Sequence, residues 1–150
     1  MIDLIRTNSE NHDFIGLVKL LDADLAKRDG EDHSFYAQFN TVDKIKYIVL
    51  AYEKAIGYGA IKEYEANTME IKRMYVWPES RKHGIATKVL TELENWAIEL
   101  SHAKCILETG KRQPEAIGLY KKNGYKPIPN YGQYAEAENS ICFEKELIAQ

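Results

Sequence analysis

Hydrophobic side chains in the first third of the chain follow two patterns, which predict a short strand and then a helix. Residues 2–6 form an apolar-rich run of strand length. After Asn11, which can cap a helix, apolar residues recur at helical spacing until Asp29 and Gly30 stop the helix. Residues 31–36 then form a polar, aromatic-rich loop or short helix.

The middle of the chain predicts three consecutive strands. Residues 47–52, 55–63 and 69–76 are strand-like, and short polar turns separate them. Gly57 and Gly59 weaken the second strand, because a glycine offers no side chain to the packing of a sheet.

The second half alternates between helical and strand patterns. Helices are predicted over residues 87–100 and 114–123, with a strand at 104–108 between them and two closing strands after them. Pro114 suits the first turn of its helix, and Gly124 suits the position just after the last turn.

The composition is that of one globular domain. The chain has 150 residues, of which 45% are hydrophobic, and this is enough for one core and too little for two. With the order of elements, it predicts a single domain over residues 1–150. The expected class is α/β (α+β), with a central, mixed and mainly antiparallel sheet flanked by helices.

Charge and segment composition exclude several classes of partner. The net charge is −3 and the pI is about 5.8, and basic residues are dispersed among acidic ones. A nucleic-acid-binding domain instead clusters Lys and Arg. No apolar run approaches the ~20 residues that span a bilayer, and the first residues have no signal-peptide pattern. We therefore expect a cytoplasmic protein with neither a nucleic-acid nor a membrane partner.

Cys105 and Cys142 lie in strand-like apolar runs and are expected to be reduced core residues. The spacing of His and Cys fits no metal site, so no metal is expected.

The candidate chemistry begins at a basic, glycine-containing turn between the strand at 69–76 and the helix after it. The turn consists of Arg81, Lys82, His83, Gly84, Ile85, Ala86 and Thr87. Backbone N–H groups at the start of a helix lack intrahelical partners and share the positive end of its dipole, so they favour phosphate oxygens. Gly84 lets the backbone approach a ligand closely, and Arg81 and Lys82 add mobile positive charge. The turn predicts a diphosphate cradle; the alternative is an ordinary strand-to-helix turn with two solvated basic residues.

The turn matches neither G-x-G-x-x-G nor G-x-x-x-x-G-K-[ST], but it resembles the R-x-x-G-x-A signature of the GNAT family of N-acetyltransferases. Residues 74–79 resemble the strand and Pro-Glu pair that precede this signature in the family. Residues 115–125 resemble the family's later helix, which ends in Tyr, Lys and Gly-aromatic. The resemblance covers roughly residues 45–147, and residues 107–110 and 113–117 look like a bacterial subgroup of small acetyltransferases of mostly unassigned substrate.

This resemblance implies acetyl-CoA as the cofactor and a sheet whose fourth and fifth strands splay apart to admit the pantetheine arm. It also implies direct transfer in a ternary complex, which needs no protein nucleophile. The backbone of Met74, Tyr75 and Val76 is expected to meet the pantetheine amides and the oxyanion. The N–H groups of residues 82–87 are expected to meet the pyrophosphate.

Tyr120 falls at the family's Tyr position and is the expected general acid. A phenol has a reference pKa of about 10, so it keeps its proton at neutral pH and can give it to a leaving thiolate. The alternative is a core Tyr that packs its helix on the sheet. Gln113, where many family members have Asn, and Lys122, two residues after the Tyr, are further candidate cofactor contacts.

The general base is open between Glu108, Glu70 and a chain of water molecules. Glu108 closes a strand just where the splay would open, and Glu70 would share the face of Met74 by period-two alternation. Either carboxylate could instead face solvent at a strand end. Arg73 is a charged residue inside a central strand, so it either pairs with one of these carboxylates or holds a substrate carboxylate.

His33 and Tyr36, in the loop after the first helix, and Tyr131, in a late aromatic loop, are expected to wall the acceptor site. The predicted function is acetyl transfer to a small-molecule amine. A non-catalytic acyl-CoA sensor and an enzyme that acetylates proteins or aminoacyl-tRNA are the alternatives, and the net charge of −3 disfavours tRNA. A homodimer is possible, because dimers are common in the family.

Overall fold

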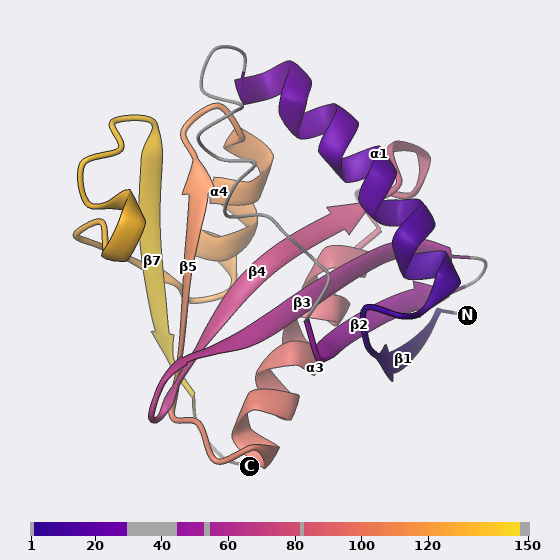
Figure 1. Ribbon diagram of the computed structural model, residues 1–150, viewed down its shortest axis with the longest axis horizontal. Helices are drawn as coiled ribbons and strands as arrows, with labels where there is room; N and C mark the ends of the chain where they lie inside the picture. Colours follow the sequence, from indigo (N-terminus) through magenta and orange to yellow (C-terminus); the bar gives the residue numbers. More distant parts are fainter. Residues whose placement is uncertain (1, 30–44, 53–54, 82, 148–150) are drawn as a thin grey trace.

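The computed structural model describes residues 2–29, 45–52, 55–81 and 83–147. They form a seven-stranded sheet in the order β1-β2-β3-β4-β5-β7-β6, in which β4 and β5 are parallel and every other neighbouring pair is antiparallel (Figure 1). The strands are β1 (Asp3–Thr7), β2 (Tyr47–Tyr52), β3 (Ala55–Glu65), β4 (Thr68–Val76), β5 (Lys104–Gly110), β6 (Lys126–Ile128) and β7 (Ser140–Glu146). The predicted α/β class with a mixed, mainly antiparallel sheet is confirmed.

Helices cover both faces of the sheet. α1 (His12–Asp29) crosses one face, and α3 (Ile85–Glu99) and α4 (Pro114–Lys122) lie on the other (Figure 1). Two short 3-10 helices, η2 (Pro78–Ser80) and η3 (Gly132–Tyr134), follow β4 and precede β7. Among the described residues, none of the helices is both long enough and apolar enough to cross a membrane.

Each face of the sheet has its own apolar core. Val89 and Leu93 of α3 are fully buried on one face, and Phe14 of α1 is fully buried on the other. The Phe14 ring meets the Tyr58 ring edge-on, with centroids 4.9 Å apart. Burying a large apolar side chain contributes about 1.5–3 kcal/mol, so the two cores fix both helix layers to the sheet. The predicted cap of α1 is also present, since the Asn11 side chain accepts a hydrogen bond from Phe14 N–H (3.0 Å).

β4 contains a β-bulge at Lys72. Ala60 of β3 pairs with Arg73, and the next residue, Ile61, pairs with Ile71, so Lys72 is an additional residue on β4. A bulge of this kind changes which side chains face which side of the sheet.

The bulge separates Glu70 from Met74. Before it, Ile71 faces the core under α3; after it, Met74 and Val76 face that core. Glu70 therefore lies on the opposite face, where its side chain contacts Tyr131. The period-two prediction that Glu70 shares the face of Met74 is wrong, because one inserted residue reverses the alternation.

β4 and β5 diverge after a short parallel ladder. The ladder joins residues 68–71 to residues 104–107. Beyond it, β4 stays paired with β3 as far as Val76, and β5 stays paired with β7 as far as Gly110. The expected splay between the fourth and fifth strands is thus present, and we call the gap between them the fork.

Both cysteines are interior residues, as predicted. Cys105 and Cys142 are fully buried and unpaired. Burial raises the pKa of the Cys105 thiol to about 12 and that of Cys142 to about 11, so both remain protonated at neutral pH.

Candidate active site

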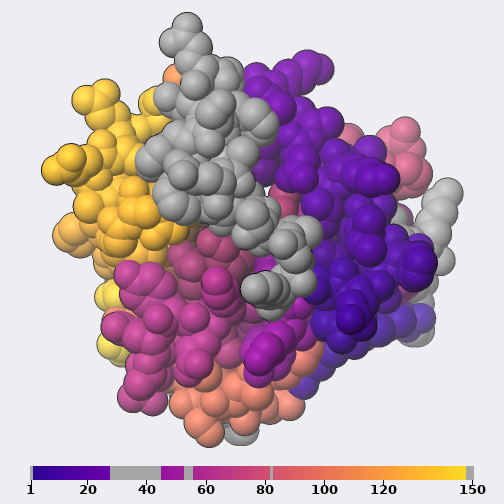
Figure 2. All heavy atoms as spheres, viewed as in Figure 1, coloured from indigo at the N-terminus to yellow at the C-terminus, as the bar shows by residue number. Residues whose placement is uncertain are grey.

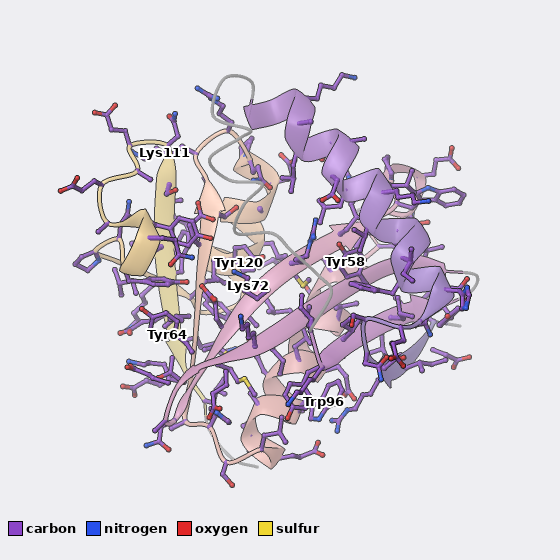
Figure 3. The ribbon with its side chains drawn as sticks, viewed as in Figure 1. Tyr58, Tyr64, Lys72, Trp96, Lys111 and Tyr120 are labelled. Carbon is purple, nitrogen blue, oxygen red and sulfur yellow. The ribbon has the colours of Figure 1, made fainter. Side chains whose placement is uncertain are left out.

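A cavity of about 420 Å³ opens at the fork. One wall is the bulged half of β4, and the other is the end of β5 with α4. The turn before α3 closes one end, and Leu21, Asp24 and Leu25 of α1 contribute to the lining. Side chains from distant parts of the sequence therefore share one space (Figure 3).

The turn before α3 presents its backbone to this cavity. Gly84 is the N-cap of α3 and has a left-handed backbone, with φ 76°. The first intrahelical bond here runs from Lys88 N–H to Gly84 C=O (3.0 Å), so the N–H groups of Ile85, Ala86 and Thr87 have no partner within the helix. All three residues and Gly84 line the cavity, which gives it an anion-favouring end.

Arg81 is anchored rather than mobile. Its Nε donates a hydrogen bond to the Val76 carbonyl oxygen (2.8 Å), and its guanidinium lies 5.6 Å from the centroid of the Tyr75 ring. It is half-buried and lines the same cavity end. His83 is exposed and is not among the lining residues, and Lys82 lies outside the described residues.

The backbone of β4 offers hydrogen-bonding groups to the fork. Trp77 N–H donates to Ile56 C=O (2.7 Å), so the Trp77 backbone points toward β3. Because backbone direction alternates along a strand, the N–H and C=O groups of Met74 and Val76 point the other way, into the fork. The Val76 carbonyl binds Arg81, which leaves Val76 N–H and both polar groups of Met74 directed at the cavity.

Tyr120 of α4 combines a packing role with a place on the cavity wall. It is 6% exposed, and its ring packs against the rings of Tyr125 (5.7 Å between centroids) and Phe143 (6.2 Å). Burial raises the pKa of Tyr120 above its usual value, and the nearby Glu108 carboxylate raises it further. The phenol therefore keeps its proton throughout the physiological range.

The two candidate carboxylates differ in their surroundings. Glu108 lines the cavity, and its Oε2 accepts a hydrogen bond from the Ser140 hydroxyl (2.6 Å). Glu70 is buried outside the lining, where its Oε2 accepts a hydrogen bond from the Tyr131 hydroxyl (2.6 Å). Its Oε1 lies 3.5 Å from Lys72 Nζ. Burial and the Glu70 charge both raise the pKa of Tyr131, so Tyr131 remains a hydrogen-bond donor.

The predicted acceptor residues are only partly brought together. Arg73 lines the cavity and forms an ion pair with Asp22 of α1, a partner that the sequence analysis did not include. Tyr131 contacts Glu70 and is not among the lining residues. His33 and Tyr36 lie outside the described residues. Gln113 and Lys122, expected near the cofactor, both line the cavity.

Residues 14–125 match the acetyltransferase (GNAT) family, which is well over half of the chain. The chain belongs to the GNAT family.

Relatives of this GNAT chain carry acetyltransferase names. It is 34% identical over 93 residues to an IAA acetyltransferase of Azospirillum brasilense, covering 61% of each protein. It is 34% identical over 86 residues to the uncharacterized N-acetyltransferase YjgM of Escherichia coli K12, covering 55% of this chain and 52% of that protein. The matched region thus spans less than two thirds of the length of either relative.

Solved GNAT structures share the whole fold. A Klebsiella pneumoniae protein named as an acyl-CoA N-acyltransferase superposes with a TM-score of 0.83 at 26% identity and covers 99% of both chains. The PaiA N-acetyltransferase of Thermoplasma acidophilum, solved in complex with coenzyme A, gives a TM-score of 0.73 at 19% identity and covers 97% of this chain and 99% of its own. At 19% identity, the similarity to PaiA shows a shared fold only.

Lys72 and Asp24 are among the lining residues of the GNAT fork that sequence reasoning missed. Lys72 lines the cavity because of the bulge, and no residue pattern had indicated a bulge there. Asp24 lines it from α1, which had been considered only as a packing element. The two adjacent positive charges of Lys72 and Arg73 inside a central strand were the available signal.

Proposed function

We propose that this protein transfers an acetyl group from acetyl-CoA to the primary amine of a small molecule, directly and in a ternary complex. The observation that carries this proposal is that one cavity joins three features that thioester aminolysis needs. They are the anion-favouring start of α3, the outward-facing backbone of β4 and the protonated phenol of Tyr120.

The residues present fit a coenzyme A molecule in an extended arrangement. N–H groups of residues 85–87 and the anchored Arg81 would hold the diphosphate. The polar backbone groups of Met74 and Val76 N–H would bind the amides of the pantetheine arm along the fork. Lys122 and Gln113 line the same side of the cavity and would contact the ligand from α4.

Acetyl-CoA supplies the acetyl group as a thioester, and its sulfur leaves with the electron pair of the C–S bond. Tyr120 gives its phenolic proton to that sulfur and regains a proton from solvent afterwards. A general acid so placed contributes about 10²–10⁴-fold to the rate.

Glu108 is the proposed proton acceptor for the attacking ammonium group, directly or through a water molecule. It lines the cavity at the fork, where the ladder of β4 and β5 ends. Each carboxylate accepts one hydroxyl hydrogen bond, Glu108 from Ser140 and Glu70 from Tyr131, but only Glu108 lines the cavity. Loss of one ammonium proton to Glu108 leaves a neutral amine with a free electron pair for attack on the carbonyl. The nitrogen gives a second proton to solvent once the C–N bond has formed, so the products are the amide, the free thiol and one released proton.

The test is to mix the purified chain with acetyl-CoA and a panel of small amines, and to follow free thiol and acetylated product together. Thiol release that depends on an amine, with matching product, supports the proposal. A thermal shift with acetyl-CoA but no turnover with any amine would instead indicate an acyl-CoA-binding module. Turnover with peptides alone would indicate a protein-acetylating enzyme.

A further inference from the structure

The bulge in β4 places two consecutive cationic side chains on one face of the sheet. Along a regular strand, the side chains of neighbouring residues point to opposite faces. Lys72 Nζ lies 3.5 Å from Glu70, and Arg73 pairs with Asp22 of α1. Both contacts are on the α1 face, so the bulge directs Lys72 and Arg73 to the same side.

This pair of cations stands at the point where β4 and β5 separate. The last ladder pair is Ile71 with Leu107, and the two cations follow immediately on β4. Glu108 follows immediately on β5, and all three charged residues line the cavity. Figure 3 shows Lys72 on β4, where β4 and β5 have separated.

The two cations face away from the end of the cavity that suits phosphates. The start of α3 and the α4 residues Tyr120 and Lys122 belong to the layer of α3 and α4. The cations instead face the layer that holds α1 and the segment with η3. These two elements lie on the same face of the sheet, at its opposite edges (Figure 2).

Both side chains are strongly desolvated. The Arg73 side chain is 2% exposed and that of Lys72 is 11% exposed. Removing a cation from water is costly unless an anion compensates, and a half-exposed partner compensates only partly because water screens it. Asp22, the partner of Arg73, is 52% exposed, and Glu70, the partner of Lys72, is 9% exposed. Both cations thus have carboxylate partners, and a ligand carboxylate would compete for Arg73 with the more exposed one, Asp22.

We propose that Lys72 and Arg73 form a carboxylate subsite, and hence that the acceptor is an amine that also carries a carboxylate, such as an amino acid. This inference rests on the proposed function. The Arg73 guanidinium matches a carboxylate through two parallel hydrogen bonds, and Lys72 adds a second donor. Glu108 across the fork receives the ammonium end, so the two ends of an amino acid meet charges of opposite sign.

The experiment compares matched acceptors. Each amino acid in a panel is assayed beside its carboxamide and its decarboxylated amine, with the full chain and saturating acetyl-CoA. Losing a charge-assisted contact should lower kcat/KM about 10- to 100-fold for the carboxamide and the amine. Lys72→Gln should reduce this preference while leaving the KM for acetyl-CoA unchanged. Lys126→Gln, an exposed change on β6, should leave the preference as it is.

Replacing Asp22, the carboxylate within the protein that pairs with Arg73, tests the subsite independently. Asp22→Asn frees Arg73 from its ion pair, so the KM for amino acids should fall while that for decarboxylated amines stays constant. Equal kcat/KM for amino acids and decarboxylated amines would overturn the subsite, and so would a preference for phosphorylated amines over carboxylated ones.

If no acceptor is turned over, the proposed function fails and the subsite is decided by binding. Amino acids should then raise the melting temperature of the protein loaded with coenzyme A, carboxamides should not, and Lys72→Gln should abolish the effect. Equal shifts with both ligands, or none, would overturn the subsite.

Discussion

Arg81 Nε donates a 2.8 Å hydrogen bond to the Val76 carbonyl oxygen, which ties the basic turn to the end of the strand that faces the fork. A charge expected to be mobile is thus held in one position by the backbone and by the Tyr75 ring.

Arg81→Ala should raise the KM for acetyl-CoA about 10-fold, because it removes one charge-assisted contact to phosphate. Arg81→Lys keeps the charge but loses the planar guanidinium, so it should recover only part of the affinity. Calorimetric titration with coenzyme A measures both. An unchanged dissociation constant for Arg81→Ala would remove Arg81 from the cofactor site.

Replacement of Gly84 separates backbone strain from steric contact. A Cβ at Gly84 meets no atom within 4 Å, but the left-handed φ of 76° disfavours any other residue. Gly84→Ala should therefore cost about 1–2 kcal/mol in the free energy of unfolding measured with urea. Gly84→Val should in addition raise the KM for acetyl-CoA strongly, because the branched side chain obstructs the diphosphate.

Gly16→Ala is the matched control, since Gly16 lies in α1 with open space around it and no positive φ. It should stabilise the protein by about 0.5–1 kcal/mol, the usual gain from replacing a helical glycine. Normal coenzyme A binding by Gly84→Val would show that the diphosphate lies elsewhere.

Tyr120→Phe keeps the ring that packs on Tyr125 and Phe143, so stability at neutral pH should change little. If the hydroxyl protonates the leaving sulfur, kcat should fall about 10²-fold with an almost constant KM for acetyl-CoA, the pattern of a contact made only in the transition state. Steady-state kinetics decide. A raised KM at unchanged kcat would assign Tyr120 to cofactor packing, and no change in either would leave it a core residue.

Substitutions of Glu108 and Glu70 should have different effects on kcat and on its pH dependence. Glu108→Gln should lower kcat about 10²-fold and remove the acidic limb of the pH–rate profile, as expected of a general base. Glu70→Gln should leave that limb intact and act on thermal stability, because Glu70 binds Tyr131 rather than the cavity. A lost acidic limb in Glu70→Gln alone would reverse the assignment.

The buried tyrosines predict a specific alkaline sensitivity. Tyr120 ionises near pH 10.0 when unfolded, and burial raises its pKa in the folded protein, as it does for Tyr125 and Tyr131. The folded state then holds more protons than the unfolded state, so stability is complete below this pH and decreases as the pH rises through it. Urea midpoints should stay level up to about pH 9 and fall between about pH 9.5 and pH 11, and Tyr120→Phe should lose less than the wild type. Constant urea midpoints over that range would contradict the buried, desolvated environment of these tyrosines.

Local patterns predicted the elements well, because periodicity and caps are properties of adjacent residues. Asn11 caps α1 as expected, and the strands on either side of the fork appear near their predicted limits. The helix predicted from residue 87 begins instead at Ile85, because Gly84 itself is the cap.

The fine arrangement of the site depends on contacts between distant residues. The bulge at Lys72 is a mismatch between β3 and β4, visible only once the two strands are in register. The partner of Arg73 lies 51 positions away in α1, and either of two nearer carboxylates satisfied the same sequence argument. The roles assigned to the cofactor and acceptor residues remain predictions.

The separation of β4 from β5 also leaves two inward-facing strand edges within a single sheet. Natural proteins usually cover or charge such edges, because unpaired backbone groups recruit other chains. An extended ligand with its own amides can complete the sheet here in place of a strand. Saturation with such a ligand at 100 times its dissociation constant would stabilise the fold by about 2.7 kcal/mol, so ligand-free protein should be the form most prone to self-association during purification.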